Sequence, residues 1–349
     1  MILRLNGSKW IFFALSLIVL PACQSLPETE PQGRSQRYSF ALIGDLPYGV
    51  PPASDSPSFE RLVATINRQS DLLWVIHTGD IKSSAETCSD EMLRDRLERF
   101  SRFRQPFIYT PGDNEWTDCH KVSAGEYEPL ERLDRLRELF FDEPGQITGG
   151  QGMQVESQRV TPGHETFVEN LRWARAGIVF ATLHVVGSQN GLAPFDPESF
   201  IQRSERDGHE VKQRIAAALA WIETTFEQAI RDDAPAVFLV MHANPALEAG
   251  HNQPPAGALK SAREGFQEIL ENLQHHTQAY GKPVVLAHGD SHYFRIDKPR
   301  LLDNLYLSNF TRVENFGARA GTRHWVKVTV DPAANDPFLF QPMSVDEGR

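Results

Sequence analysis

The chain has 349 residues, of which 40% are hydrophobic and 23% are charged. This is an ordinary globular composition, long enough to bury one large core or two modest ones. The formal net charge of −11 argues against a general nucleic-acid-binding surface, because such a surface needs a basic footprint. An acidic excess fits a protein that holds divalent cations with carboxylates, and it also fits a plain solvated surface. We therefore expect no nucleic acid as a structural partner.

Residues 1–22 have the pattern of a lipoprotein signal peptide. Two basic residues precede an apolar stretch over residues 10–20, which is short for a permanent membrane span. The stretch ends in Leu-Pro-Ala-Cys, which resembles a bacterial lipoprotein processing site, so Cys23 is the expected lipidated residue. A simple secretory peptide with an incidental Cys23 is the alternative. Gln24 favours the outer membrane, so we expect an exported protein whose lipid anchor holds it to that membrane, facing the periplasm.

Residues 23–37 are rich in Pro, Gln, Glu and Ser, which predicts a flexible tether. From residue 38 to residue 345, continuous apolar runs alternate with amphipathic helical patterns, which predicts one α/β domain. Because the apolar runs are continuous, each is expected to be a strand covered on both faces. The expected strands are 38–44, 72–78, 107–110, 178–186, 236–242, 284–288, 305–308 and 325–330, and the expected helices are 58–68, 90–103, 129–140, 211–230 and 263–280.

Cys88 and Cys119 are the cysteines that remain after the lipidation site. Each follows a Gly-Asp pair at the end of a predicted strand. An oxidising compartment favours pairing them, so we predict a disulfide, with two buried free thiols as the alternative.

Acidic or imidazole side chains fall directly after several of the predicted strands. In open α/β sheets, ligands gather at the carboxyl ends of the strands. A glycine precedes each of the strand-end aspartates, and we expect it to let the backbone turn sharply there. Carboxylates brought to one edge repel one another unless cations lie between them, so the pattern predicts a polynuclear metal site. The predicted ligands are Asp45, Asp80, Asp113, His242, Asp290 and His292.

The order of these motifs resembles that of the calcineurin-like metallophosphoesterase superfamily. The segments read GDLPYG, HTGD, PGDNE, MHAN and HGDSH, against the family order D-x-H, G-D-x-x, G-N-H-E/D, a later H, and G-H-x-H. The resemblance covers residues 38–292. It implies an α/β fold, a layered sandwich of two mixed β-sheets flanked by helices. It also implies metal-dependent hydrolysis of a phosphate mono- or diester by a metal-bound hydroxide.

The resemblance further implies two divalent metal ions, which we expect to be Mn, Fe or Zn because carboxylates dominate the ligands. It implies a role for each of the six residues. Asp45 and His292 are expected at the first metal, Asp113 and His242 at the second, Asp80 between the two, and Asp290 in place of the first His of G-H-x-H.

Two positions depart from the family pattern. Pro47 stands where the first motif has a His, and its neighbour Tyr48 is either a rim tyrosine or a phenolate ligand. Asn114 stands at the catalytic His position, where an amide cannot act as a general acid. We take His120 as the candidate proton donor, since the predicted disulfide would hold its loop near the site. A surface histidine is the alternative.

Two functions follow from these observations. The first is a membrane-anchored phosphoesterase that acts on a phosphorylated small molecule or headgroup. The second is a non-catalytic lipoprotein that keeps the fold and binds a metal or ligand. Pro47 and Asn114 favour the second function. The retained strand-end aspartates, with His242 and His292, favour the first, and we prefer it.

Overall fold

Two mixed β-sheets pack face to face in the computed structural model, which describes residues 36–49, 56–142, 152–247, 263–302, 305–317 and 322–345. The strands are β1 (Tyr38–Ile43), β2 (Leu72–His77), β3 (Phe107–Tyr109), β4 (Glu156–Ser157), β5 (Leu171–Arg175), β6 (Ile178–Thr182), β7 (Val237–Val240), β8 (Val284–His288), β9 (Arg295–Asp297), β10 (Phe310–Glu314), β11 (His324–Val330) and β12 (Phe338–Ser344). Within the described ranges, one sheet has five strands in the order β12-β11-β1-β2-β3, and β1, β2 and β3 run parallel. The other has seven in the order β4-β5-β6-β7-β8-β10-β9, and β6, β7, β8 and β10 run parallel.

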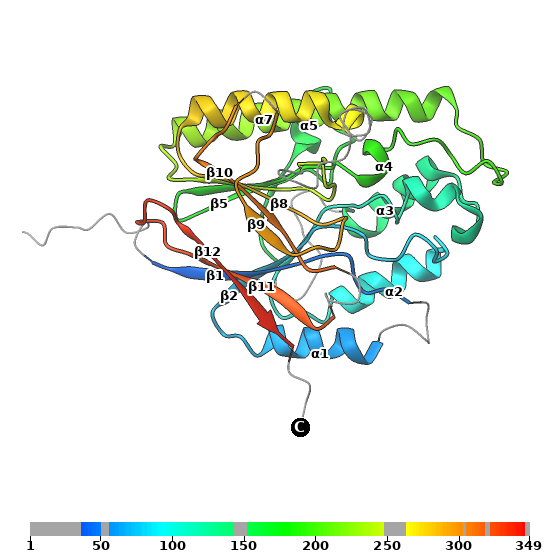
Figure 1. Cartoon of the computed structure of the whole chain (residues 1–349). Coiled ribbons are helices and arrows are strands. Elements are labelled where there is room, and N and C mark those ends of the chain that lie inside the picture. Colours follow the sequence, from blue (N-terminus) through cyan, green and yellow to red (C-terminus); the bar gives the residue numbers. More distant parts are fainter. Residues whose placement is uncertain are drawn as a thin grey trace, which may run out of the picture. The chain divides into compact units, whose positions relative to one another are not determined.

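Helices cover the outer face of each sheet (Figure 1). The five-stranded sheet carries α1 (Ser56–Asn67) and α2 (Asp90–Phe100), and the seven-stranded sheet carries α5 (Glu205–Arg231) and α7 (Gln267–Tyr280). The remaining helices are α3 (Pro129–Phe140), α4 (Gly187–Asn190) and the 3₁₀ turns η1 (Thr117–His120), η2 (Val122–Ala124), η3 (Gln158–Val160) and η4 (Glu264–Phe266).

Aromatic side chains fill the space between the two sheets. Phe40 of β1 stacks on Trp74 of its own sheet, with ring centroids 5.5 Å apart. Its ring also meets Phe180 and Phe238 of the other sheet edge-on, at 5.8 and 5.3 Å. These rings are buried, and large buried aromatics contribute much of a core's apolar free energy. The packing therefore sets how the two sheet edges face each other.

The parallel strands end at matching levels. In the five-stranded sheet Ile43 pairs with His77, and His77 pairs with Tyr109. In the seven-stranded sheet Ala287 pairs with both Val240 and Val313. The turns that follow these strands consequently leave both sheets at their carboxyl edges, where the predicted ligands lie.

The predicted sandwich of two mixed sheets with flanking helices is confirmed. The predicted strand over 305–308 is wrong, because the strand in that region is β10, which starts at Phe310, after the predicted strand has ended. The short outer strands β4, β5 and β9, and the edge strand β12, were not predicted, since their apolar runs are brief or mixed with polar residues.

The expected signal peptide and the lipidation site Cys23 lie outside the described residues, as does most of the tether. The helices of the described ranges include none that is both long and apolar enough to cross a membrane.

Candidate metal centre

Left-handed backbone turns carry the predicted ligands out of the strands. Asp45 and Asp80 have φ of 54° and 56°, and Asp290 and His292 have φ of 78° and 60°. Few residues other than glycine adopt such angles, and when they do the surrounding structure must hold them there. Strained backbone of this kind clusters at functional sites. Asp113 and His242 do not share this conformation, and residues outside the motifs, such as Ala176 and Asp233, also adopt it.

The glycines before the aspartates have a different role from the one predicted. Of these glycines, Gly79 has a positive φ, at 101°, whereas Gly44, Gly112 and Gly289 do not. These positions require glycine because neighbouring atoms leave no room for a Cβ atom. A Cβ on Gly112 would sit 2.2 Å from Asp80 Oδ1, and one on Gly289 would sit 2.4 Å from Asp45 Oδ2. The strand-end glycines thus make room for the carboxylates, and the aspartates themselves take the turn.

The two sheets bring their ligands together around His242. Its Nε2 atom lies 3.3 Å from Asp80 Oδ1 and 3.1 Å from Asp113 Oδ1. The ligand atoms of Asp45, Asp80 and His242 all lie within 4.8 Å of one another, and so do those of Asp113, His242 and Asp290. Each group offers nitrogen and oxygen donors for one divalent ion. His242 belongs to both groups.

The donor atoms fit a cation. His242 Nδ1 lies 2.9 Å from the Thr78 carbonyl oxygen, so this nitrogen donates its proton and Nε2 points to the carboxylates. Asp113 Oδ1 and His242 Nε2 are both buried and face each other at 3.1 Å, and among the described residues neither has a hydrogen-bond partner outside this cluster. Buried polar atoms are rarely left this way, and a divalent ion with imidazole and carboxylate ligands would satisfy both.

The charges of the cluster also favour a bound cation. Burial raises the pKa of Asp80, and the neighbouring Asp113 and Glu115 raise it further, against the opposing charge of His242. Burial also raises the pKa of Asp290 to about 6. Burial disfavours the charged His242 imidazolium, but Asp80, Asp113 and Asp290 outweigh it and raise the pKa of His242. Without a cation, protons relieve the repulsion among these carboxylates, and a cation would replace them.

Asn114, at the family's catalytic His position, binds Asp80. Its backbone N–H donates to Asp80 Oδ1 at 3.1 Å, and its side-chain Nδ2 donates to Asp80 Oδ2. The next residue, Glu115, accepts hydrogen bonds from the backbone of Asp80 at 3.1 Å and of Gly112 at 2.7 Å. Both residues therefore orient Asp80. Glu115 was not predicted as a site residue, although it occupies the E/D position of the family motif.

Asp45 has partners from the C-terminal part of the chain. His292 Nε2 lies 3.4 Å from Asp45 Oδ1, and the backbone N–H of Asp290 donates to the same oxygen at 3.0 Å. Asn315 Nδ2 donates to Asp45 Oδ2 at 3.3 Å, while Asn315 Oδ1 accepts from Thr78 at 2.7 Å. Asn315 was missed from the sequence; the one available signal was its place directly after a strand.

Tyr48 lies at the rim of the centre. Its hydroxyl is 3.2 Å from His292 Nε2 and 3.5 Å from Asp80 Oδ2. Burial, followed by the charges of Asp80 and Asp45, raises the pKa of Tyr48. In the metal-free centre Tyr48 is therefore a phenol that donates to a carboxylate. Pro47 supplies no ligand atom at the position of the motif His.

Comparison with known proteins adds the fold relationship. No family model and no curated protein matches the chain. Among solved structures, PhoD (alkaline phosphatase D) matches over 92% of this chain and 73% of that chain, with a TM-score of 0.51 and 10% sequence identity. The fold is PhoD-like. This likeness concerns the fold alone, and it confirms the predicted layered sandwich of two mixed sheets.

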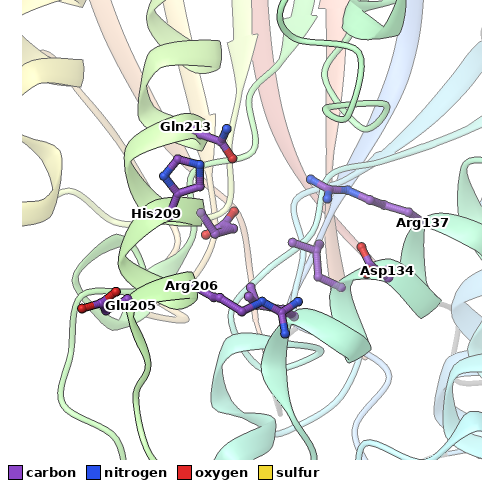
Figure 2. A pocket seen from close by; sticks show the side chains of 9 residues that line it. Asp134, Arg137, Glu205, Arg206, His209 and Gln213 are labelled. Atoms are coloured by element: carbon purple, nitrogen blue, oxygen red, sulfur yellow. The ribbon is translucent and has the colours of Figure 1, made fainter.

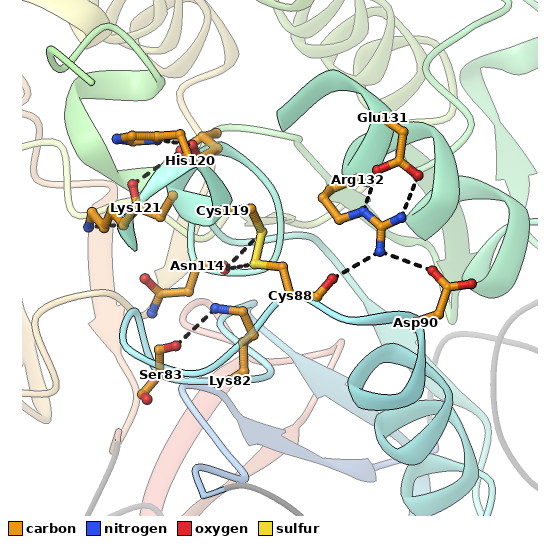
Figure 3. The surroundings of a disulfide bond; sticks show 12 residues. Lys82, Ser83, Cys88, Asp90, Asn114, Cys119, His120, Lys121, Glu131 and Arg132 are labelled. Atoms are coloured by element: carbon orange, nitrogen blue, oxygen red, sulfur yellow. Dashed lines mark hydrogen bonds and ion pairs between the residues drawn. A yellow bond between two sulfur atoms is a disulfide. The ribbon is translucent and has the colours of Figure 1, made fainter. Parts of the chain in front are cut away.

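The predicted disulfide between Cys88 and Cys119 is confirmed, and it lies beside the centre of this PhoD-like fold. Both sulfur atoms contact the backbone carbonyl oxygen of Asn114, at 3.6 and 3.7 Å (Figure 3). On its other side, Arg132 of α3 donates to the carbonyl oxygen of Cys88 at 2.9 Å. The disulfide thus joins the turn before α2 to the loop that carries Asn114.

His120 is buried in the same loop. Its Nδ1 donates to the carbonyl oxygen of Thr117 at 2.7 Å, and its ring stacks on Phe195 with centroids 4.1 Å apart. These contacts tie His120 to the surrounding loops. Its role as a proton donor stays a prediction.

A cavity of about 550 Å³ lies between α3 and α5 (Figure 2). Arg137 and Asp134 reach it from α3, and Arg206 and His209 reach it from α5. Arg137 is already paired with Glu169, at 2.6 and 3.0 Å. The cavity contains charges of both signs and shares no residue with the metal centre.

Proposed function

We propose that this chain is a metal-dependent phosphoesterase that hydrolyses a phosphate mono- or diester. One observation carries the proposal. Ligand atoms from both sheets converge within 4.8 Å, and two of them, Asp113 Oδ1 and His242 Nε2, are buried with no partner outside the cluster among the described residues. Such an arrangement is costly to maintain unless a cation binds. The PhoD-like fold supports the proposal.

The proposed centre holds two divalent ions, Mn, Fe or Zn. Asp45 and Asp80 would hold one of them, completed from the rim by His292, and Asp113, His242 and Asp290 would hold the other, because the single lone pair of His242 Nε2 can serve one ion only. When bound, such ions supply Lewis-acid stabilisation of the phosphoryl oxygens and lower the pKa of water. Asn114 and Glu115 keep Asp80 in position for this task.

The proposed substrate is a phosphorylated small molecule or headgroup. We further propose that the protein is exported and lipid-anchored at Cys23, facing the periplasm. Leaving-group protonation is the weak point of the centre, because Asn114 has no acidic proton and is bound to Asp80. An ester with an acidic alcohol, such as an aryl phosphate, is therefore expected to react faster than an alkyl ester, by roughly the 10²–10⁴-fold that a general acid contributes.

The lack of an acidic proton on Asn114 favours a second candidate function. A protein that keeps the ligands but lacks a proton donor at the reacting atoms suits a non-catalytic metal- or ligand-binding lipoprotein. His120, packed on Phe195, is the residue whose role separates the two functions.

Metal content and hydrolysis together test the proposal. The purified full-length chain should contain about two ions and hydrolyse an aryl phosphate or an aryl phosphodiester. Asp80→Asn should lower the rate at least about 100-fold, since losing a mere orienting partner can cost that much. The exposed Asp336→Asn is the matched control, with an unchanged rate expected. Bound metal without hydrolysis would support the second function, and wild-type activity in Asp80→Asn would refute the role of Asp80.

A further inference from the structure

A strained turn after β6 contacts Asp113, a proposed ligand of the second ion. Three consecutive residues in α4, Ser188, Gln189 and Asn190, have φ of 50°, 56° and 56°. None of them is glycine, and L residues rarely adopt this left-handed region even singly. A run of three persists where the surrounding structure determines it. The sequence motif GSQN showed no metal ligand, and the predicted site did not include it.

Contacts on the far side of the turn hold it in place. The buried Arg214 of α5 donates to the Asn190 carbonyl oxygen at 3.0 Å and also to its side-chain Oδ1. Asn190 Nδ2 donates to the Gly265 carbonyl oxygen at 3.0 Å. Gly265 itself lies so close that a Cβ there would be 2.0 Å from the carbonyl oxygen of Gln189. The turn is therefore clamped between α5 and η4.

Contacts on the near side reach Asp113. A Cβ on Gly187 would sit 2.5 Å from Asp113 Oδ1, so the backbone of the turn lies directly against this carboxylate. The Ser188 hydroxyl lies 2.8 Å from Asp113 Oδ2 and 2.9 Å from Asp118 Oδ1. Each oxygen of Asp118 has another donor, Thr117 Oγ1 at 3.5 Å for Oδ1 and Lys121 for Oδ2. The single hydroxyl proton of Ser188 is thus available to Asp113.

The hydrogen bond from Ser188 divides the two oxygens of Asp113. Oδ2 accepts from Ser188, while Oδ1 lies 3.1 Å from His242 Nε2 and has no other hydrogen-bond partner among the described residues. We propose that Ser188 is a positioning residue that fixes the Asp113 carboxylate so that Oδ1 is presented to a divalent cation. This inference rests on the proposed function. It adds a residue that acts on the second ion through Asp113 and does not touch that ion.

Two variants separate the hydroxyl from the backbone. Ser188→Ala removes the hydroxyl at a left-handed position, and Ser188→Gly removes it while relieving the backbone strain. Ser157→Ala is the matched control, because the Ser157 hydroxyl also makes a buried hydrogen bond, to the Val168 carbonyl oxygen at 2.9 Å, away from the cluster. Binding of Mn²⁺ to the full-length chain, by calorimetry and by the EPR signal of free Mn²⁺, gives the affinity of each ion. Melting of the metal-free chains gives their stability.

The wild-type chain and Ser157→Ala should each bind two ions, and the affinity for each ion should be the same in both chains. Both Ser188 variants should bind one of the two ions roughly 10- to 100-fold more weakly, which is the usual effect of losing an orienting partner. The metal-free Ser188→Gly chain should melt at or above the wild-type temperature, which a purely structural role of the hydroxyl does not predict. Wild-type affinity in either Ser188 variant would overturn the proposal. A wild-type chain that binds no Mn²⁺ would instead overturn the proposed function, and the positioning role with it.

Discussion

At the scale of single residues, the centre depends on which atoms are left without a partner. His242 donates a hydrogen bond from Nδ1 to a backbone carbonyl oxygen, and its Nε2 faces Asp113 Oδ1. Ser188 donates a hydrogen bond to the other oxygen of the same carboxylate. These hydrogen bonds leave His242 Nε2 and Asp113 Oδ1 facing the space where a cation would lie. Replacement of the family's His by Asn114 follows the same pattern, because the amide holds Asp80.

His77 makes the metal-free protein sensitive to acid. Its Nε2 donates to the Leu46 carbonyl oxygen at 2.8 Å, and its Nδ1 accepts from the Gly79 N–H at 3.1 Å, so the ring must be neutral. Burial lowers the pKa of His77 to about 4. The unfolded chain takes up this proton below about pH 6.5, whereas the folded chain does so only near pH 4. We expect His77 to cost about 3 kcal/mol of unfolding free energy as the pH falls from 6.5 to 4.

Urea denaturation of the metal-free chain at several pH values measures this effect. His77→Phe should be less stable at pH 7, because Leu46 and Gly79 lose a hydrogen-bond partner. As the pH falls, however, its unfolding free energy should decrease less steeply, because its unfolding takes up close to one proton fewer. An equal slope in both chains would show that His77 does not carry the acid sensitivity.

At the scale of elements, a cross-link supports the loop that carries Asn114. The Cys88–Cys119 disulfide closes a loop of 31 residues in sequence separation and lies against the carbonyl oxygen of Asn114. Strand ends in a parallel sheet leave such loops free to move unless something ties them down. The disulfide ties the loop to the turn before α2, and Arg132 of α3 in turn binds that turn at the Cys88 carbonyl oxygen.

Removal of this disulfide should lower both stability and metal affinity. The paired change Cys88→Ser with Cys119→Ser is expected to cost about 3–4 kcal/mol of unfolding free energy, through the entropy of the opened loop. Denaturant midpoints under oxidising conditions measure the loss. The wild-type chain treated with a reductant serves as control and should approach the midpoint of the variant. Equal midpoints of wild type and variant without reductant would contradict the expectation.

At the scale of the whole molecule, the metal centre joins the two sheets. Asp45, Asp80 and Asp113 follow strands of the five-stranded sheet, whereas His242 and Asp290 follow strands of the seven-stranded sheet. A cation held by both groups must lose ligands when the sheets separate. Metal binding is therefore expected to stabilise the sandwich as a unit.

A divalent ion should raise the melting temperature of the chain. At 100 times its dissociation constant, one ion that binds only the folded state stabilises it by about 2.7 kcal/mol, or roughly 5 °C for a chain of this size. Calorimetric scans with EDTA and with added Mn²⁺ measure the difference. Asp80→Asn should show a much smaller response. An identical melting temperature with and without metal in the wild-type chain would contradict the proposed centre.

The sequence by itself determined the strand-end aspartates and histidines, because an apolar run followed by Gly-Asp specifies a strand and its turn within about ten residues. The sandwich fold was predicted from the resemblance of the motif order to a known family, and the cysteine pair from the expected oxidising compartment. The tertiary structure alone decided the role of the glycines, the binding of Asn114 to Asp80, and the contacts of Ser188 and Asn315. Asn315 and Asp45 are 270 residues apart, and Ser188 and Asp113 are 75 apart. Such contacts depend on strand register and sheet packing, which a local pattern does not encode.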